Sequence, residues 1–489
     1  MLITSIVIYM AITIGIGLWA ARNVHSSKDY LVAGRSLPLY VNTATVFATW
    51  FGAETVLSIS ATFARDGLNG IPGDPFGASA CLVIAAILFA RTFYRMNLLT
   101  LGDFYRKRYD SRIEVLTSLC VTVSYLGWTS AQLTALGLVI WILSAGSLTL
   151  TQGILIGAAI VLIYTIFGGM WSIAFTDMLQ TVVIVIGLLI VAYYLGDLAG
   201  GAGKVIAQAQ ADGKLNFWPS GDKGGLADWL TFIAAFITIA LGSIPQQDVF
   251  QRMTSAKDEK TAVRGTILGA SGYFVMAFVP MFIAYAALMI DPNLRELFKS
   301  EDAREIQRIL PDIILNKTPL YIQILFFGAL LSAIMSTASG TLLAPTAIFT
   351  NNVMKPFMGH MSDAQLLKTV RVVLVIFCGA ALVFAVNSKS TMYEMVQNAY
   401  KVTLAGAFVP LAFGVYWKKA NNAGAAASIF AGLGVWISAE LKLFPTVIAG
   451  AEVPPQLYGL AAAIIAMIAV SLATHGRSPS HHSAIHGSH

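Results

Sequence analysis

Apolar segments long enough to cross a lipid bilayer follow one another through most of this chain. A membrane-spanning α-helix needs about 20 consecutive apolar residues, and thirteen segments of roughly that length occur here. Of the 489 residues, 57% are hydrophobic and only 11% are charged, whereas soluble proteins carry about 25% charged residues. The pattern predicts an all-α integral membrane protein with spans at 2–21, 39–63, 75–98, 113–144, 149–168, 174–196, 229–252, 265–290, 319–350, 367–387, 393–416, 424–443 and 456–473.

The first segment and the three cysteines each allow two interpretations. Residues 2–20 have the length of a signal peptide, but they lack a basic leading region and a small-residue cleavage site before Arg22. We therefore expect a first helix that is retained. Cys81, Cys120 and Cys378 all lie in apolar segments, which predicts buried small side chains and not a disulfide or a metal site.

Basic residues predict which loops face the cytoplasm. Lys and Arg number 31 against 25 Asp and Glu. In a membrane protein this excess gathers in cytoplasmic loops and does not imply a nucleic acid partner. When the segments alternate sides, Arg106 and Lys257 fall on the side richer in basic residues, and Lys214 and Lys299 fall in two long loops on the other. We expect a plasma (inner) membrane location, with the N-terminus outside and the C-terminus in the cytoplasm.

Two interrupted segments mark an internal repeat. Segments 39–63 and 229–252 are each followed by four further spans, which gives two units of five helices. Because five is an odd number of crossings, the second unit must be inverted in the membrane, as in secondary transporters. The expected organisation is a leading helix and cytoplasmic loop (1–38), a first repeat (39–196), an extracellular loop (197–228), an inverted second repeat (229–416), two trailing helices (417–473) and a cytoplasmic His-rich tail (474–489).

The first interrupted segment has an acid near its middle. Glu54 follows Gly52 and Ala53, and a carboxylate near mid-bilayer is costly and marks a functional site. A Gly-Ala pair allows a helix to unwind and offer backbone carbonyls to an ion, and such broken helices hold the binding sites of secondary transporters. A second break is expected at 242–245, the run Gly-Ser-Ile-Pro.

Hydroxyl side chains cluster in the segment 319–350. Ser336, Thr337 and Ser339 lie on adjacent turns of the expected helix, and the carbonyl of Ala333 lies one turn earlier. These oxygens are the kind of ligand that Na⁺ prefers. Two alternatives stay open, since hydroxyls in membrane helices also bond to their own backbone and small residues allow close helix packing.

An acid and two tryptophans form a further set of candidates. Asp177 lies near a membrane segment, where it needs a cation or hydroxyl partner. It could instead cap the N-terminus of a helix at the cytoplasmic end. Trp50 and Trp128, with Gln132 one turn after Trp128, lie near the expected centre. Aromatic faces can hold a cationic headgroup, and packing between helices is the alternative.

The chain has no motif for nucleotide binding or for catalysis. It contains no phosphate-binding Gly-x-x-x-x-Gly-Lys-Ser/Thr, no His-Glu-x-x-His and no convincing nucleophile–base pair. We therefore expect a transporter driven by an ion gradient and not an enzyme. A passive channel is the rival, but it would need a continuous polar stripe, whereas the mid-span polar residues cluster at two breaks.

Four stretches resemble the sodium/solute symporter family, whose fold is the LeuT-type inverted repeat with one extra leading helix. They are FGAETV (51–56), YTIFGGMWSIAFTDMLQ (164–180), GSIPQQDVFQR (242–252) and AIMSTAS (333–339). The resemblance implies a Na⁺-coupled symporter of about 13 transmembrane helices that imports a small polar solute by alternating access. It implies Na⁺, the lipid bilayer and the solute as partners, and a functional monomer.

The resemblance also implies which residues bind Na⁺. Carried across by position, the main site takes the carbonyls of Ala53, Val56 and Ala333 and the hydroxyls of Ser336 and Thr337. Some members hold a second Na⁺ on an acid at the position of Asp177 and on hydroxyls at those of Ser336, Ser339 and the next residue. Here that next residue is Gly340, so one ligand of the second ion is missing.

Within the family, the chain looks most like choline-transporter-like or proline-type members. Residues 128–137 and 244–252 are the grounds, although Gln246 stands where choline carriers have a tryptophan. The solute, an amino acid or a choline- or betaine-like ion, is expected between the two breaks. A sugar or a monocarboxylate is the alternative. The residues expected to bind it are Glu54, Trp128, Gln132, Gln246 and Gln247.

Overall fold

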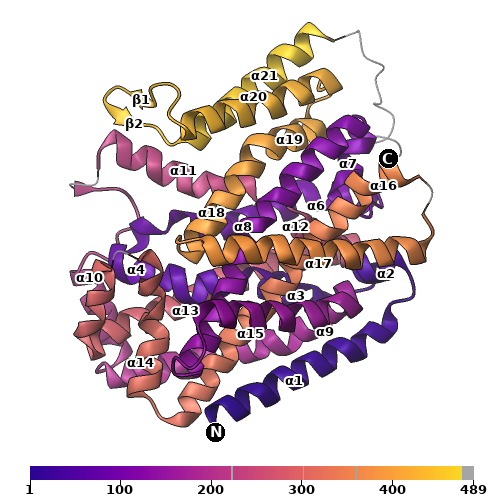
Figure 1. Ribbon diagram of the computed structural model, residues 1–489. Coiled ribbons are helices and arrows are strands. Elements are labelled where there is room, and N and C mark those ends of the chain that lie inside the picture. The colour runs from indigo at the N-terminus through magenta and orange to yellow at the C-terminus, as the bar shows by residue number, and fades with distance from the viewer. Residues whose placement is uncertain (222–223, 301, 360, 476–489) are drawn as a thin grey trace.

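Helices make up almost all of the ordered structure. The computed structural model describes the chain except for residues 222–223, 301, 360 and 476–489 (Figure 1), so most of the predicted His-rich tail lies outside the described residues. Within the described part, the one sheet is a small hairpin of β1 (Val447–Ile448) and β2 (Ala451–Glu452). The predicted all-α class is confirmed.

The α-helices have the following bounds. They are α1 (Leu2–Ala20), α2 (Ser27–Val32), α3 (Leu39–Trp50), α4 (Ser60–Asp66), α5 (Ala78–Ile84), α6 (Ala90–Arg95), α7 (Leu101–Arg108), α8 (Ser111–Leu143), α9 (Leu150–Leu198), α10 (Ala202–Ala211), α11 (Leu226–Gly242), α12 (Gln247–Ser255), α13 (Glu259–Ile290), α14 (Ile309–Lys317), α15 (Leu320–Ile348), α16 (Lys355–Met358), α17 (Asp363–Asn387), α18 (Met392–Thr403), α19 (Val409–Tyr416), α20 (Asn422–Glu440) and α21 (Pro455–Ala473). Short 3₁₀ or π turns join some of them, namely η1 (Ala21–Asn23), η2 (Ala33–Arg35), η3 (Glu54–Ile59), η4 (Leu68–Gly70), η5 (Pro72–Gly77), η6 (Ala85–Phe89), η8 (Pro292–Lys299), η9 (Ala303–Arg308), η10 (Phe349–Met354) and η11 (Leu404–Phe408).

The number of spans is close to the predicted thirteen but does not reach it. Among the described residues, 10 helices are long and apolar enough to cross a membrane, and the count is 12 when each of two bent pairs is one span. The predicted segments 149–168 and 174–196 lie on either side of Gly169, where φ of 50° and ψ of −140° interrupt α9 with a kink. The part before the kink includes the apolar stretch Leu150–Ile163, which is shorter than the roughly 20 residues that cross a bilayer.

Both predicted breaks occur. The first bent pair joins α3 to Glu54–Asp66 at 55°, and the second joins α11 to α12 at 46°. Phe51 leaves the helical region with ψ of 74° and is followed by Gly52. At the second break Pro245 has no N–H to continue a helix, and Gln246 has an extended backbone. Each break leaves backbone carbonyls at a helix end without an intrahelical partner.

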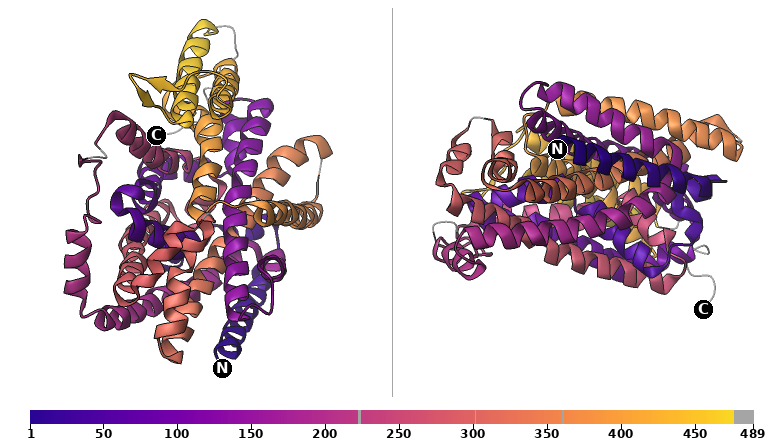
Figure 2. Two further views of the ribbon diagram at one scale, coloured as in Figure 1. Left: turned by 60° about the vertical axis from the view of Figure 1, so that its left-hand side comes forward. Right: turned by 90° about the horizontal axis from the view of Figure 1, so that it is seen from below.

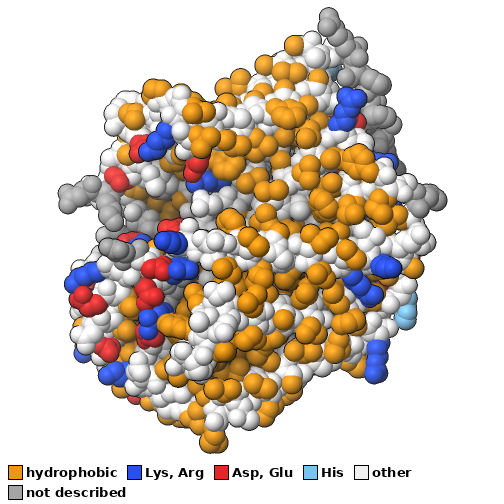
Figure 3. All heavy atoms as spheres, in the orientation of Figure 1, with side chains coloured by type: hydrophobic (Ala, Val, Ile, Leu, Met, Phe, Trp, Pro, Cys, Tyr) orange, Lys and Arg blue, Asp and Glu red, His pale blue; other side chains and the backbone are white. Residues whose placement is uncertain are grey.

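The helices pack so that both breaks lie inside the bundle. Helix α15 packs against α8 and α9, α8 also packs against α18, and α13 packs against α3. The leading helix α1 lies along α9, and α20 and α21 pair at the periphery (Figures 1 and 2). In the space-filling view, apolar side chains cover a broad face, while charged side chains gather around α10 and α14 at the left rim (Figure 3). This arrangement suits a bundle surrounded by lipid.

Candidate functional site

The carboxylate of Glu54 lies at the first break and is held by two side chains of α8. Trp128 donates its Nε1–H to Oε1 at 2.9 Å, and Gln132 donates Nε2–H to Oε2 at 2.5 Å. The Gln132 Oε1 in turn accepts the N–H of Ala53 at 3.1 Å. Glu54 is 2% exposed. The structure therefore brings together three of the residues expected to bind solute.

Aromatic rings pack beside this carboxylate. The ring centroids of Trp50 and Trp128 are 5.7 Å apart, and each lies near Tyr400, at 6.5 and 5.8 Å. Tyr125 stacks on the other side of Trp128, with centroids 6.1 Å apart. The rings come from α3, α8 and α18, so this aromatic group, Trp50, Tyr125, Trp128 and Tyr400, joins both repeats. Such faces attract a cation electrostatically.

The two glutamines of the second break have different surroundings. Gln246 donates Nε2–H to the hydroxyl of Ser124 at 2.9 Å and to that of Thr403 at 3.3 Å, so it bridges α8 and α18. Gln247 instead accepts the N–H of Leu101 at 2.8 Å, at the start of α7. The structure ties Gln247 to α7, and its part in solute binding stays a prediction.

Two buried acids near the breaks escaped the sequence analysis. Asp248 accepts a hydrogen bond from the hydroxyl of Tyr125, and Asp74 accepts one from the hydroxyl of Tyr273. Both acids are at most 5% exposed. Asp248 lies inside an expected apolar span, and Asp74 lies one residue before another. The same reasoning on intramembrane charge that identified Glu54 would have identified them.

Asp177 and the hydroxyl cluster meet between α9 and α15. Ser336 donates its hydroxyl to Oδ1 of Asp177 at 2.6 Å, and both residues are fully buried. Asp177 lies well inside α9, so the alternative of a helix N-cap is wrong. Ser339 donates to the carbonyl of Ser336 at 2.9 Å, so for this hydroxyl the alternative of a bond to its own helix holds. Ala333 is buried on the same helix.

A backbone carbonyl from the end of α3 also approaches this cluster. The Thr337 hydroxyl approaches the carbonyl of Ala48 at 3.5 Å, and Ala48 lies in the last turn before the break. The carbonyl of Val56, which the resemblance implied, accepts the Ser60 hydroxyl at 2.5 Å, and Ala53 precedes the π turn η3. The sequence analysis did not name Ala48, because only the fold shows which turn of the broken helix faces α15.

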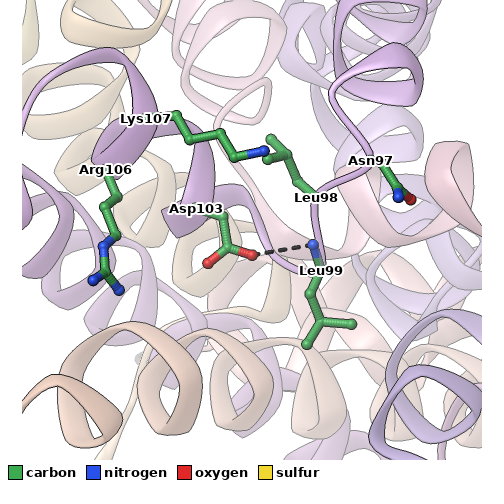
Figure 4. Close-up of a pocket in the computed structure, with 6 residues that line it drawn as sticks. All are labelled: Asn97, Leu98, Leu99, Asp103, Arg106 and Lys107. Carbon is green, nitrogen blue, oxygen red and sulfur yellow. Dashed lines mark hydrogen bonds between the residues drawn. The ribbon is translucent and has the colours of Figure 1, made fainter. Parts of the chain in front are cut away.

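Cavities lie beside α7, α8 and α10 in the described part of the chain. One of about 500 Å³ lies between residues 97–99 and helix α7, where Asp103 accepts the N–H of Leu99 at 3.0 Å (Figure 4). A cavity of about 270 Å³ lies beneath α10. A third, of about 120 Å³, is lined by Thr134 and Trp141 of α8 and by the turn η9.

Helix α8, which carries Trp128 and Gln132, also lines the third cavity through Thr134, Leu138 and Trp141. Arg308 lies over the ring of Trp141, with its Cζ 5.2 Å from the centroid. Asp302 pairs with Arg304 beside it, and these hydrogen bonds hold the pKa of Asp302 below its ordinary value. The Arg304 side chain also donates to the carbonyl of Ser388, just before α18.

Comparisons with known proteins identify a transporter family and a related fold. The profile of the Sodium:solute symporter family matches residues 30–432. The human high affinity choline transporter 1 is 26% identical over 443 residues, which cover 88% of this chain and 75% of that one. The Escherichia coli sodium/pantothenate symporter is 26% identical over 442 residues, 88% of each chain. A solved Na⁺-coupled sialic acid symporter, substrate-bound and outward-open, superposes with a TM-score of 0.79 at 19% identity and covers 98% of both chains.

The fold and the two broken helices are those of a multi-pass membrane protein with the LeuT-type inverted repeat. The chain belongs to the sodium:solute symporter family. The family resemblance seen in the sequence is thus confirmed, and so is its main implication, Na⁺-coupled symport of a small solute. Sodium is the coupling ion that the family implies.

Proposed function

We propose that this protein imports a small polar solute with a cationic or zwitterionic end, and that Glu54 and the aromatic group bind that end. The observation that carries the proposal is the buried Glu54 carboxylate, which receives hydrogen bonds from Trp128 and Gln132 beside the ring of Trp50. A carboxylate beside aromatic faces favours a positive group over a bare anion. Choline is the solute named for the human relative, and it has such a group.

The Na⁺ site is proposed at the hydroxyl cluster of α15 and the end of α3. The hydroxyls of Ser336 and Thr337 and the carbonyls of Ala333 and Ala48 are the oxygens that support it, with Ala53 and Val56 implied by the family. One Na⁺ entering down about 100 mV and a tenfold gradient releases about 3.7 kcal/mol, enough for roughly 500-fold accumulation of a neutral solute. Because the broken helix carries both proposed sites, ion binding there can favour solute binding.

The placement in the membrane is also part of the proposal. We propose the predicted domain bounds, a plasma-membrane location, a functional monomer, an outer N-terminus and a cytoplasmic C-terminus. The distribution of basic residues supports this orientation. Under it, the cavity lined by Trp141 opens outside and the cavity beside α7 opens to the cytoplasm.

The test is uptake and binding by the purified full-length chain in proteoliposomes. A thermal-shift screen with and without Na⁺ covers choline, betaines, amino acids, sugars and monocarboxylates. We expect a Na⁺-dependent shift with a cationic or zwitterionic solute and uptake that requires an inward Na⁺ gradient. Sugars and monocarboxylates are the second candidates, since a glucose cotransporter from Vibrio parahaemolyticus is 24% identical over 462 residues, 87% of this chain and 82% of that one. A response to sugars alone would reject the proposed solute class.

A further inference from the structure

The first turn of α7 is hydrogen-bonded to a residue of the second break. Gln247, the first residue of α12, accepts the N–H of Leu101, the first residue of α7, at 2.8 Å. The leading N–H groups of a helix lack an intrahelical partner, so Gln247 satisfies one of those of α7. Gln247 is fully buried, and its amide nitrogen has no hydrogen-bond partner among the described residues. The buried side chain of Gln247 is thus directed to α7.

The same turn is joined to the end of α15. Asp103 accepts the side-chain N–H groups of Asn351 and Asn352 at Oδ1, each at 2.9 Å. Its other oxygen accepts the N–H of Leu99 at 3.0 Å (Figure 4). Thr100, just before α7, donates its hydroxyl to Oδ1 of Asn352 at 2.6 Å. Both asparagines belong to η10, the π turn that continues α15, so one turn of α7 contacts both α12 and the end of α15.

Gly102 lets η10 approach this turn closely. A Cβ atom at this position would collide with the side chain of Asn352, which is fully buried. At the other end of α7, Arg108 donates to the carbonyls of Gly414 at 2.8 Å and Ala420 at 2.9 Å. Between the two ends, the cavity of about 500 Å³ lies along α7 (Figure 4). Helix α7 is therefore anchored at both ends, while one side of it borders open space.

We propose that Gln247 and Asn352 are positioning residues that act through α7, so that α12 and α15 move together when the carrier changes conformation. Helix α12 follows the second break, and α15 carries the proposed Na⁺ ligands Ser336 and Thr337. Separating either element from α7 would leave buried polar groups without partners, which is unfavourable. Gln247 thus acts on transport without touching the solute. This inference rests on the proposed function, because it concerns the transport cycle of the same carrier.

The experiment separates solute binding from the rate of transport in the purified full-length chain. Gln247→Met keeps the length of the side chain and removes the acceptor for Leu101. Radioactive choline, glycine betaine and proline are the probes, in equilibrium binding and in Na⁺-driven uptake by proteoliposomes. We expect the dissociation constant to stay within about twofold of the parent and the maximal uptake rate to fall about tenfold, the loss expected when the transport step needs this hydrogen bond. Asn352→Leu should give the same result.

A matched control removes a buried hydrogen bond of α7 that joins neither α12 nor α15. The hydroxyl of Tyr105 donates to the carbonyl of Ala407 at 3.0 Å, and Tyr105→Phe should leave both quantities within about twofold of the parent. The double variant Gln247→Met with Asn352→Leu should be about as slow as the slower single variant, because either change already releases α7 from one of the coupled elements. Two independent losses would multiply, and that result would overturn the inference.

The other results also have distinct meanings. Weaker solute binding by Gln247→Met with an unchanged maximal rate would make Gln247 a solute ligand and overturn the inference, as would binding and uptake equal to those of the parent. If Gln247→Met does not fold, Asp103→Asn tests the same turn, because an amide cannot accept at both oxygen positions. It should slow uptake without weakening solute binding, and an unchanged rate would overturn the inference. Na⁺-dependent uptake of none of the three probes by the parent would instead reject the proposed function.

Discussion

Replacing Glu54 with glutamine removes the formal charge that the first break contributes to the proposed solute site. The parent carboxylate accepts hydrogen bonds from Trp128 at 2.9 Å and from Gln132 at 2.5 Å, one on each oxygen. A glutamine can accept at only one of these positions, because its amide nitrogen would face a second donor. A bound cationic solute also loses its charged partner.

The expected loss of binding free energy follows from the hydrogen bond that the solute loses. A hydrogen bond to a charged group contributes about 1.5–3 kcal/mol, so solute affinity should fall about 10- to 150-fold. Na⁺ affinity measured without solute should change by less than about twofold, since the proposed Na⁺ ligands lie on other residues. Isothermal titration with the solute found in the screen gives both constants.

A matched control separates this effect from a general loss of one acid. Glu394, an exposed acid at the start of α18, accepts the N–H of Thr391 at 2.9 Å and lies far along the chain from both breaks. Glu394→Gln should leave solute affinity unchanged. If Glu54→Gln and Gln246→Ala both keep solute affinity within about twofold of the parent, the solute site lies elsewhere and the reasoning from the first break is wrong.

Two further predictions test the ion site and the orientation. Ser336→Ala or Thr337→Ala should raise the Na⁺ concentration for half-maximal uptake, because each removes a proposed oxygen ligand, whereas Thr346→Ala, a buried hydroxyl that bonds back to its own helix, should not. Uptake that runs equally well on a proton gradient without Na⁺ would contradict the ion assignment. Cysteines placed at 106, 257, 214 and 299, in a background without the three native cysteines, should react with an impermeant thiol reagent on whole cells only at 214 and 299. Labelling at 257 but not at 214 would mean the opposite orientation.

Local sequence was sufficient to predict the all-α membrane fold class and the two breaks in the helices. The apolar lengths predict spanning helices because each helix satisfies its own backbone hydrogen bonds in lipid. Gly52 and Pro245 interrupt their helices for reasons that act within a few residues, namely glycine's freedom and proline's missing N–H. Glu54 could be identified because a charge inside an apolar segment stands out in the sequence alone.

Span number was harder to predict from hydropathy. The two segments on either side of Gly169 were predicted as separate spans, and α9 is interrupted at this glycine, but the stretch Leu150–Ile163 is short for a full span. Apolar length does not show whether a chain leaves the membrane or changes direction within it, because both give an interruption of the same kind.

Only the tertiary structure decided which residues meet at the sites. Tyr400 joins Trp50 and Trp128, the Ala48 carbonyl faces Thr337, and Gln247 accepts the N–H of Leu101. These partners come from helices far apart along the chain, and the rotation of each helix about its axis determines which turn faces its neighbour. That rotation depends on the packing of the whole bundle, which no local pattern of residues contains.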